Sequence, residues 1–204
     1  MDEDIYDEMK KSGTFEDILF ALCFISSPNL YKFSNRNAQI WRRGLVAMFN
    51  EADLDVIFME MAKNVNHQPH TVVECYPVPK SIGDLAPMYF KKALLECEEE
   101  WAQNKKIVDL SKKDLRKSIP RGFSYFAVDF GLQNGYCHVI ENETKFAKTF
   151  GQEIICGMMD LDESLWRRPV KQTLDEQTKR AEHLRRKWMP FDWTERVKER
   201  LKND

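Results

Sequence analysis

The pattern of residues 122–141 constrains the fold of this chain more than any other stretch. "GFSYFAVDFG" at 122–131 has the composition of a half-buried strand, and "YCHVIE" at 136–141 is a second run rich in strand-forming residues. Asn134-Gly135 between them is a strong hairpin signal, because both residues tolerate the left-handed backbone of a tight turn. The sequence therefore predicts an antiparallel pair here.

Two further apolar runs predict strands upstream of the hairpin. "LDVIFMEMA" at 54–62 and "HTVVECYPV" at 70–78 are separated by a polar loop. Pro77 and Pro79 end the second run, since proline cannot donate a ladder hydrogen bond.

A helix is predicted over residues 83–103, "GDLAPMYFKKALLECEEEWAQ". Asp84 suits the N-cap, and Pro87 then falls in the first turn, where proline is tolerated. The side chains expected on its buried side are Leu85, Tyr89 and Leu95.

The C-terminal half predicts further helices. "SKKDLRK" at 111–117 indicates a short helical turn ended by Pro120, and Thr173 with Glu176 forms a capping-box pattern at a helix start. One expected apolar helix face consists of Phe150, Ile154, Ile155, Met158 and Met159. The face expected after the capping box consists of Ala181, Leu184 and Trp188, with Pro190 as the stop.

The order is thus helix, two strands, helix, hairpin and helices, which predicts an α+β fold with antiparallel strands. A chain of 204 residues can bury a core as one domain or two small ones. A junction is expected near residues 79–84, where prolines gather.

Residues 11–39 interrupt a helical pattern. Without them, Ile5 and Met9 continue the apolar spacing of the helix-like stretch at 40–49. We expect an insertion within a helix, such as a translated intron or an error of the gene model. A genuine strand-and-loop excursion is the alternative.

Charge and cysteine content exclude some classes of function. The net charge is −2, so any nucleic-acid binding must come from a local patch. The acidic start "MDEDIYDE" is unlike a signal peptide, and 17–25 is too short to span a bilayer, which predicts an intracellular protein. The cysteines are odd in number and form no CxxC pair, so we expect free thiols at Cys23, Cys75, Cys97, Cys137 and Cys156.

The stretch "NHQPHTVVECYPVP" at 66–79 raises the question of a metal or catalytic site. His67, His70 and Cys75 could supply three ligands, but structural zinc sites usually pair two such clusters, and the sequence has only one. We therefore expect no metal. No glycine-rich phosphate loop occurs either, and no cofactor is expected.

Alternation along the strand places His70, Val72 and Glu74 on one face. A nucleotidyl-transferring strand needs a nucleophilic histidine where Val72 stands, and valine cannot attack a phosphate. The sequence thus predicts no catalysis, with His70 and His138 as the weak acid–base candidates if there were any.

The C-terminal region is the candidate for RNA binding. Residues 163–204 hold twelve Lys or Arg against eight Asp or Glu. Arginine beside aromatic rings suits phosphate contact and base stacking, although a solvated helix face is the plainer alternative. The expected contact residues are Trp166, Arg167, Arg168, Lys171, Arg185, Arg186 and Lys187. "SKKDLRKSIPR" at 111–121 is a second basic stretch.

Several long strings identify a family: "PHTVVECYPVPK", "GDLAPMYFKKAL", "IPRGFSYFAVDFGLQNGYCHVIE", "FGQEIICGMMDLDESLWRRP" and "KWMPFDWT". Together they resemble the C-terminal region of the CwfJ family, the Cwf-nineteen-like splicing factors, over residues 53–194. Among its branches the chain looks closest to the "like protein two" members.

The resemblance implies two consecutive domains, a partial domain related to the HIT (histidine triad) fold at 1–80 and a small α+β domain at 81–204. It implies a nuclear, non-catalytic role in pre-mRNA splicing, in late and intron-lariat spliceosomes, linked to lariat turnover. Implied partners are spliceosomal proteins, RNA (an intron lariat or a small nuclear RNA) and the lariat debranching enzyme, with no membrane.

The chain departs from the family's pattern in three respects. The family's upstream HIT-like strands are missing before residue 53, so we expect an N-terminally truncated member. Residues 11–39 have no expected counterpart, and Val72 breaks the triad. Two alternatives stay open: a HIT-type nucleotidyl or phosphodiester hydrolase, and a protein-only scaffold for the debranching enzyme.

Overall fold

The computed structural model describes residues 20–25, 31–63, 65, 70–97, 107–120, 122–168 and 171–194. Its elements are β1 (Phe20–Ile25), α2 (Tyr31–Glu51), β2 (Leu54–Ala62), β3 (His70–Pro79), α3 (Lys80–Glu96), β4 (Val108–Asp109), α4 (Leu115–Ser118), β5 (Ser124–Phe130), β6 (Gln133–Ile140), α5 (Phe150–Met158), α6 (Ser164–Arg167), α7 (Leu174–Trp188) and a 3₁₀ turn, η2 (Met189–Phe191).

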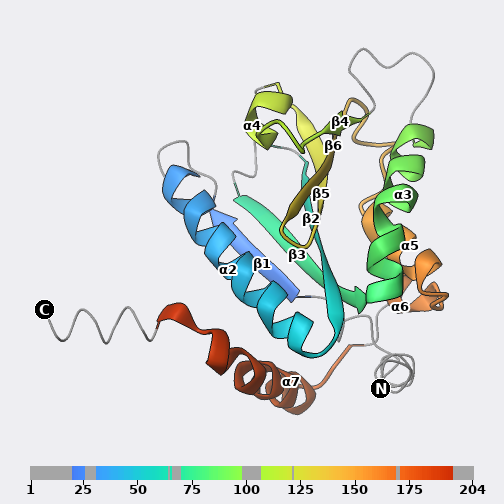
Figure 1. The fold of residues 1–204 in the computed structure, drawn as a ribbon. Coiled ribbons are helices and arrows are strands. Elements are labelled where there is room, and N and C mark those ends of the chain that lie inside the picture. Colours follow the sequence, from blue (N-terminus) through green and yellow to red (C-terminus); the bar gives the residue numbers. More distant parts are fainter. Residues whose placement is uncertain are drawn as a thin grey trace, which may run out of the picture.

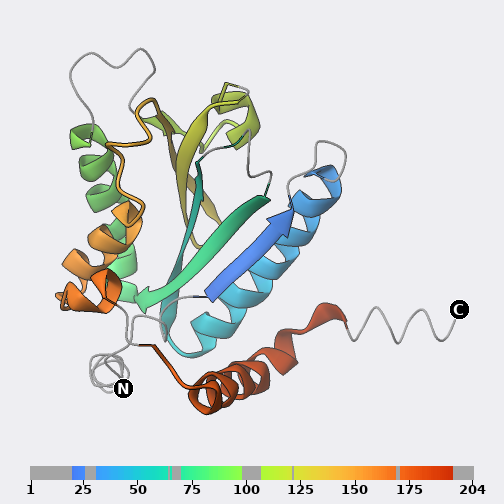
Figure 2. The same ribbon diagram turned by 180° about the vertical axis from the view of Figure 1, so that it is seen from behind.

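The described strands form one antiparallel sheet in the order β1-β3-β2-β5-β6-β4. Helices cover both of its faces, with α2 on one side and α3 and α5 on the other (Figures 1 and 2). The predicted α+β class with antiparallel strands is therefore confirmed.

The pairing of β2 with β5 joins the two halves of the chain. Ile57 is opposite Phe130, and Ala62 is opposite Tyr125. Strands from both sides of the predicted boundary between residues 80 and 81 thus belong to a single sheet. The division into a HIT-like remnant and a second domain stays a prediction.

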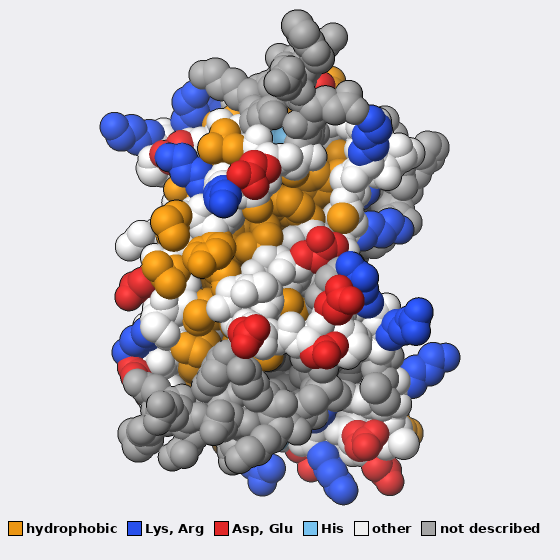
Figure 3. Space-filling model, turned by 90° about the vertical axis from the view of Figure 1, so that its right-hand side faces the viewer, with side chains coloured by type: hydrophobic (Ala, Val, Ile, Leu, Met, Phe, Trp, Pro, Cys, Tyr) orange, Lys and Arg blue, Asp and Glu red, His pale blue; other side chains and the backbone are white. Residues whose placement is uncertain are grey.

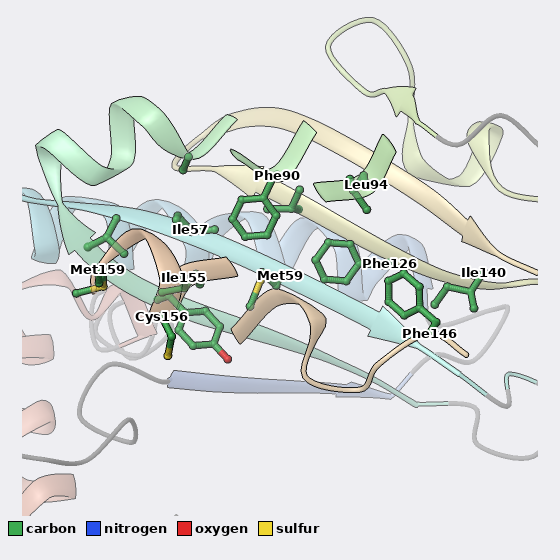
Figure 4. Packing of buried hydrophobic residues seen from close by; sticks show 14 residues of the cluster. Ile57, Met59, Phe90, Leu94, Phe126, Ile140, Phe146, Ile155, Cys156 and Met159 are labelled. Atoms are coloured by element: carbon green, nitrogen blue, oxygen red, sulfur yellow. The ribbon is translucent and has the colours of Figure 1, made fainter. Parts of the chain in front are cut away.

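The core on one sheet face lies beneath α3 and α5. Alternation along β2 and β5 directs Met59 and Phe126 to this face, where Phe126 meets Phe90 of α3 at 6.4 Å between ring centroids. Figure 4 shows these side chains between the sheet and the helices. The buried members are Ile57, Met59, Tyr76, Val78, Ala86, Phe90, Leu94, Phe126, Val128, Ile140, Phe146, Ile155, Cys156 and Met159.

The opposite face carries two separate clusters. Beneath α2 lie Leu45, Met48, Phe49, Leu54, Val56, Phe58, Val73 and Cys75, with α7 packed against them. Beside α4 lie Leu110, Ala127 and Cys137.

Helix α3 corrects the predicted helix in two ways. It begins at Lys80 with Pro79 as its N-cap, so Asp84 is not the cap and Pro87 lies inside the helix. The predicted buried side is also wrong, because Ala86, Phe90 and Leu94 are the buried residues. Phe90 is buried because its ring packs against the sheet, where it also contacts Phe130 edge-on with 6.0 Å between ring centroids.

The other stripe of α3 is left at the surface. Exposed fractions are 46% for Leu85, 44% for Tyr89 and 49% for Leu95, and Met88 lies between them at 60%. Hydrophobic side chains gather on the side of the molecule that carries α3 and α5 (Figure 3). Leu85, Met88 and Tyr89 are neighbours on one helical stripe, and Leu95 lies two turns beyond Met88 on the same side.

The β5–β6 hairpin turns at a different place from the one predicted. Gly131 and Leu132 form the turn, and Gly131 adopts the left-handed φ of 58°. Asn134 and Gly135 already belong to β6. Gly135 is required there for space, because an added Cβ would lie 2.4 Å from the Val128 carbonyl oxygen and 2.7 Å from the Phe130 ring.

The stretch 11–39 contributes two described segments. Residues 20–25 form β1, which pairs with β3 from Phe20 opposite Cys75 to Ile25 opposite His70. Residues 31–39 are the first turns of α2. This arrangement corresponds to the strand-and-loop alternative; Ile5, Met9 and the rest of residues 1–19 lie outside the described residues, and the insertion stays a prediction.

Most other predicted elements are confirmed. β2 covers 54–62 and β3 covers 70–79, and Ile155 of α5 and Met159 at its C-cap are buried as expected. Pro77 does not end β3 as predicted, because it lies opposite Val56 within the strand. In the described part of the chain no helix is both long and apolar enough to cross a bilayer.

We predict that Gly135→Ala destabilises the protein by about 1–3 kcal/mol, because the new methyl group meets rigid backbone and a packed ring. Gly157→Ala is the matched control. A Cβ there has nothing within 4 Å, and in α5 alanine is favoured over glycine by about 0.5–1 kcal/mol. Denaturant unfolding of both variants measures the difference. Equal stability of the two would contradict the close approach.

Candidate nucleic-acid interface

Helix α7 carries much of the predicted basic surface, and its start is defined by a capping box. The Glu176 amide donates to Thr173 Oγ1 at 3.3 Å, and the Thr173 amide donates to Glu176 Oε2 at 2.7 Å. The Thr173 hydroxyl also donates to Glu176 Oε2, at 2.9 Å. The bonds that the Thr173 amide and hydroxyl donate lower the pKa of the Glu176 carboxyl, the amide bond being the larger cause. The predicted capping box is confirmed.

Trp188 anchors the other end of α7 on α2. Its ring stacks on Trp41 with centroids 4.9 Å apart. It also covers Gly44, where an added Cβ would lie 2.5 Å from the Trp188 ring. Leu184 and Phe191 join the same apolar cluster, while Ala181 is exposed. Because α7 buries none of its residues fully, this contact holds it in place.

The basic residues of α6 and its flank are at the surface. Arg167 is 58% exposed and forms an ion pair with Glu163 at 3.2 Å. Arg168 and Lys171 are also exposed. Trp166 lies in α6, but its side chain is outside those described, so its predicted stacking role stays a prediction.

Arg185, Arg186 and Lys187 are exposed in the last turn of α7. α7 extends away from α6 in both views (Figures 1 and 2). From Leu174 to Arg185 the helix rises by roughly 16 Å at 1.5 Å per residue. The predicted residues therefore form two separate basic clusters rather than one patch. Cations at a helix C-terminus are also favoured by the helix dipole, which keeps a purely structural role possible for the second cluster.

The histidine candidates do not converge. His138 is fully buried, and its ring stacks on Phe146 at 5.5 Å. Its Nε2 lies 3.9 Å from Cys97 Sγ. The backbone of His70 pairs with Ile25, but its side chain, like the whole of His67, is outside the described part. His138 thus has the position of a core histidine.

Residues 72 and 74 lie on the strand as predicted. Glu74 accepts hydrogen bonds from Tyr76 Oη at 3.1 Å and Gln152 Nε2 at 3.0 Å, so its carboxylate faces α5. Burial raises the pKa of the Glu74 carboxyl, and the two hydrogen bonds oppose that shift. Val72 offers no nucleophile.

The described thiols are free, and three of the four are buried. Cys75, Cys137 and Cys156 are buried, and Cys97 is partly exposed. Burial raises the pKa of both Cys137 and Cys156 to about 11 and also raises the pKa of Cys75, which keeps these thiols protonated and unreactive at neutral pH. Among the described residues no group of three or more potential metal-ligating side chains comes together.

Sequence reasoning missed a polar cleft on the α2 face of the sheet. We call it the α2–α4 cleft; it has a volume of about 450 Å³. Its lining residues are Gln39, Arg42, Phe58, Met59, Glu60, Val73, Leu110, Ser111, Lys112, Lys113, Asp114, Leu115, Ala127, Asp129 and Asn134. Two signals in the sequence pointed to it: Glu60, a charged residue inside the apolar run 54–62, and the basic stretch 111–121, which supplies Lys112 and Lys113 to the lining.

Two acidic residues form the floor of the cleft. Asp129 binds Arg42 Nη2 at 2.7 Å and accepts from the Gly135 amide at 2.9 Å. Glu60 accepts from the Tyr125 hydroxyl. Burial is the largest cause that acts on the pKa of the Glu60 carboxyl, and it raises that pKa. The hydrogen bond from Tyr125 lowers the pKa, the nearby Asp129 charge raises it, and the Arg42 charge lowers it. The raised pKa means that folding favours the protonated form of Glu60.

We predict that Trp188→Ala lowers stability by about 2 kcal/mol and releases α7, since the Trp41 stack is lost and Gly44 is uncovered. Faster tryptic cleavage within 179–187 measures the release. Met189→Ala is the control, because Met189 is 68% exposed and its truncation should change stability by less than about 0.5 kcal/mol. Equal protease resistance of the two variants would show that Trp188 is not the anchor.

We predict that Glu60→Gln raises stability relative to the wild type, and more at about pH 7.5 than at about pH 4. Below about 4.5 the glutamate is protonated in both the folded and the unfolded state. As the pH rises from there through the raised pKa, ionisation of the buried Glu60 lowers the free energy of unfolding of the wild type. The variant has no such loss, because glutamine does not ionise. Unfolding at both pH values tests this, with exposed Glu182→Gln as the control. A difference independent of pH would contradict a raised pKa.

Comparison with known proteins assigns the chain to a family. A family described as "Protein similar to CwfJ C-terminal" matches residues 25–91, and one described as "Protein similar to CwfJ C-terminus 2" matches residues 100–194. The chain belongs to the CwfJ family. The two matches include every described strand from β2 to β6 and the helices from α5 to α7.

Relatives of this CwfJ-family chain have CWF19-type names, and one of them is named as a pre-mRNA-splicing factor. "CWF19-like protein 2" of Danio rerio is 52% identical over 156 residues, which are 76% of this chain and 16% of that protein. The Homo sapiens protein of the same name is 50% identical over 76% of this chain and 17% of its own length. "Pre-mRNA-splicing factor cwf19" of Schizosaccharomyces pombe is 35% identical over 74% of this chain and 25% of its own length. The chain thus spans a quarter or less of each.

Proposed function

We propose that this chain is a non-catalytic module that works in the nucleus, in late and intron-lariat spliceosomes, and contacts RNA and spliceosomal proteins. Its splicing-associated role rests on CwfJ family membership together with a relative named as a pre-mRNA-splicing factor. The link to lariat turnover and to the debranching enzyme is part of the proposal.

The RNA contact rests on the exposed cations of α6 and α7. Arg167, Arg168 and Lys171 lie at the surface with their charge available to a polyanion, since the ion pair of Arg167 with Glu163 is itself exposed and weak. The protein contact rests on the exposed apolar stripe of α3, because such stripes on soluble domains usually mark interaction surfaces.

The burial of His138 and the valine at position 72 disfavour hydrolysis. A general acid or base must reach the proton it transfers, and His138 is enclosed between Phe146 and the core. A hydrolase of HIT type therefore has little support in the described residues. A scaffold without RNA contact is the alternative that the following experiment separates.

We predict that the chain binds single-stranded RNA with an affinity that falls steeply with salt. Arg167→Glu with Arg168→Glu should weaken binding and reduce the slope of log affinity against log salt by about 1.4, which corresponds to two phosphate contacts. Fluorescence anisotropy with labelled RNA at several salt concentrations measures both.

Lys145→Glu with Lys148→Glu is the matched control, because both lysines are exposed and the change in charge is the same. If the two double variants weaken RNA binding equally, the loss of affinity is explained by net charge and not by Arg167 and Arg168. No salt-dependent binding at all would favour the protein-only scaffold.

A further inference from the structure

The α2–α4 cleft is a polar gap in the core of one sheet face. On the α3 side the buried side chains form one continuous cluster. On the α2 side they form two clusters, and the cleft lies between them, with Phe58 and Val73 from one and Ala127 and Leu110 from the other in its walls. A fold that only needed stability would fill such a gap with apolar side chains.

The floor of the cleft presents a hydrogen-bonding group that the fold does not need. Arg42 pairs with Asp129 at 2.7 Å, which compensates that carboxylate. Arg42 also lies over the Phe58 ring, 4.4 Å from its centroid, so its position is held from two sides. The partner of Glu60 among these side chains is the neutral Tyr125 hydroxyl. One carboxyl oxygen of Glu60 is thus bonded, and the carboxyl group lines the cavity.

The mouth of the cleft is basic. Lys112 and Lys113 are exposed on the turn before α4, and Ser111 precedes them. A second hollow of about 640 Å³ lies on the other side of the same turn and adds Lys117 and Ser118 to the lining. The basic stretch 111–121, which the α6–α7 surface leaves unused, therefore borders cavities on both sides.

We propose that the α2–α4 cleft holds one nucleotide of a single-stranded RNA, with a phosphate at Lys112 and Lys113 and the base edge at Glu60. The inference rests on the proposed function and adds to it a second RNA contact at a defined place. A volume of about 450 Å³ is within the usual range of small-ligand sites. The lining is mainly polar, as a nucleotide requires.

The proposal implies a base preference. An ionised Glu60 carboxylate can only accept a hydrogen bond, so it pairs with the exocyclic amine that cytosine carries at N4, whereas uracil presents a carbonyl oxygen at the same position. Because burial raises the pKa of Glu60, the preference should strengthen as the pH rises and Glu60 loses its proton. The two bases have the same ring size, so they differ mainly at this edge. The cleft should therefore prefer cytidine to uridine.

The site is separate from the strand face of the predicted triad. Glu74 and Tyr76 face α5, whereas Val73 and Cys75 lie in the cluster beneath α2, on the cleft side of β3. It is also separate from the α6–α7 surface, which lies at the opposite end of the molecule from α4 (Figures 1 and 2). Substitutions in the cleft, on the triad face of β3 and on the α6–α7 surface can therefore be interpreted independently.

The test measures binding of oligocytidine and oligouridine of about ten nucleotides to the full chain over a range of salt. Wild type should bind oligocytidine about tenfold more tightly. Lys112→Glu with Lys113→Glu should weaken the binding of both oligonucleotides alike and lower the salt slope by about 0.7, which corresponds to the one phosphate held by the two lysines. Glu60→Gln should leave the salt slope unchanged and reduce the preference for oligocytidine over oligouridine, because the glutamine amide can also donate to the uracil oxygen.

Controls keep the outcomes distinct. Lys145→Glu with Lys148→Glu matches the charge change away from the cleft, and thermal unfolding shows that each variant folds. Equal binding of the two ligands by wild type, or normal binding by the Lys112 and Lys113 variant, overturns the cleft proposal. If RNA binding is then lost only with Arg167→Glu and Arg168→Glu, the proposed function survives alone. If the wild type binds no RNA, both proposals fail.

Discussion

The rest of the structure depends on the burial of β2 on both faces. Val56, Ile57, Phe58 and Met59 are each no more than 2% exposed. A strand buried on both sides needs neighbours on both edges and helices above and below. β3 and β5 supply the edges, α2 covers one face, and α3 with α5 covers the other. This single requirement brings the two halves of the chain into one sheet.

The same requirement explains where the helices present their apolar side chains. α3 has two apolar stripes, and the sheet buries the one that carries Phe90 because that ring fits between Phe126 and Phe130. The second stripe, with Tyr89 at its middle, is then left at the surface. On the other side α7 attaches to α2 through Trp188 and Leu184, so most of its charged residues remain exposed. These two exposed sets are the surfaces on which the proposed protein and RNA contacts rest.

The two faces of the sheet differ in how completely they are packed. One face is a continuous apolar core, and the other is divided by a cleft that holds Glu60 and the Arg42–Asp129 pair. Buried acids without full compensation lower stability and are often retained for binding. In our two proposals the C-terminal basic clusters would contact RNA through charge alone, whereas the cleft would also contact a base.

The sequence by itself determined the elements whose signals are local. β2 and β3 match their apolar runs, and the capping box of Thr173 with Glu176 forms as its spacing predicts, because strand alternation and helix caps involve only near neighbours. The tertiary structure decided what depends on distant contacts. It placed the hairpin turn at Gly131, because Gly135 is needed to let the Val128 backbone approach. It also assembled the cleft, since α2, β2, β5 and the turn before α4 meet only through the pairing of β2 with β5.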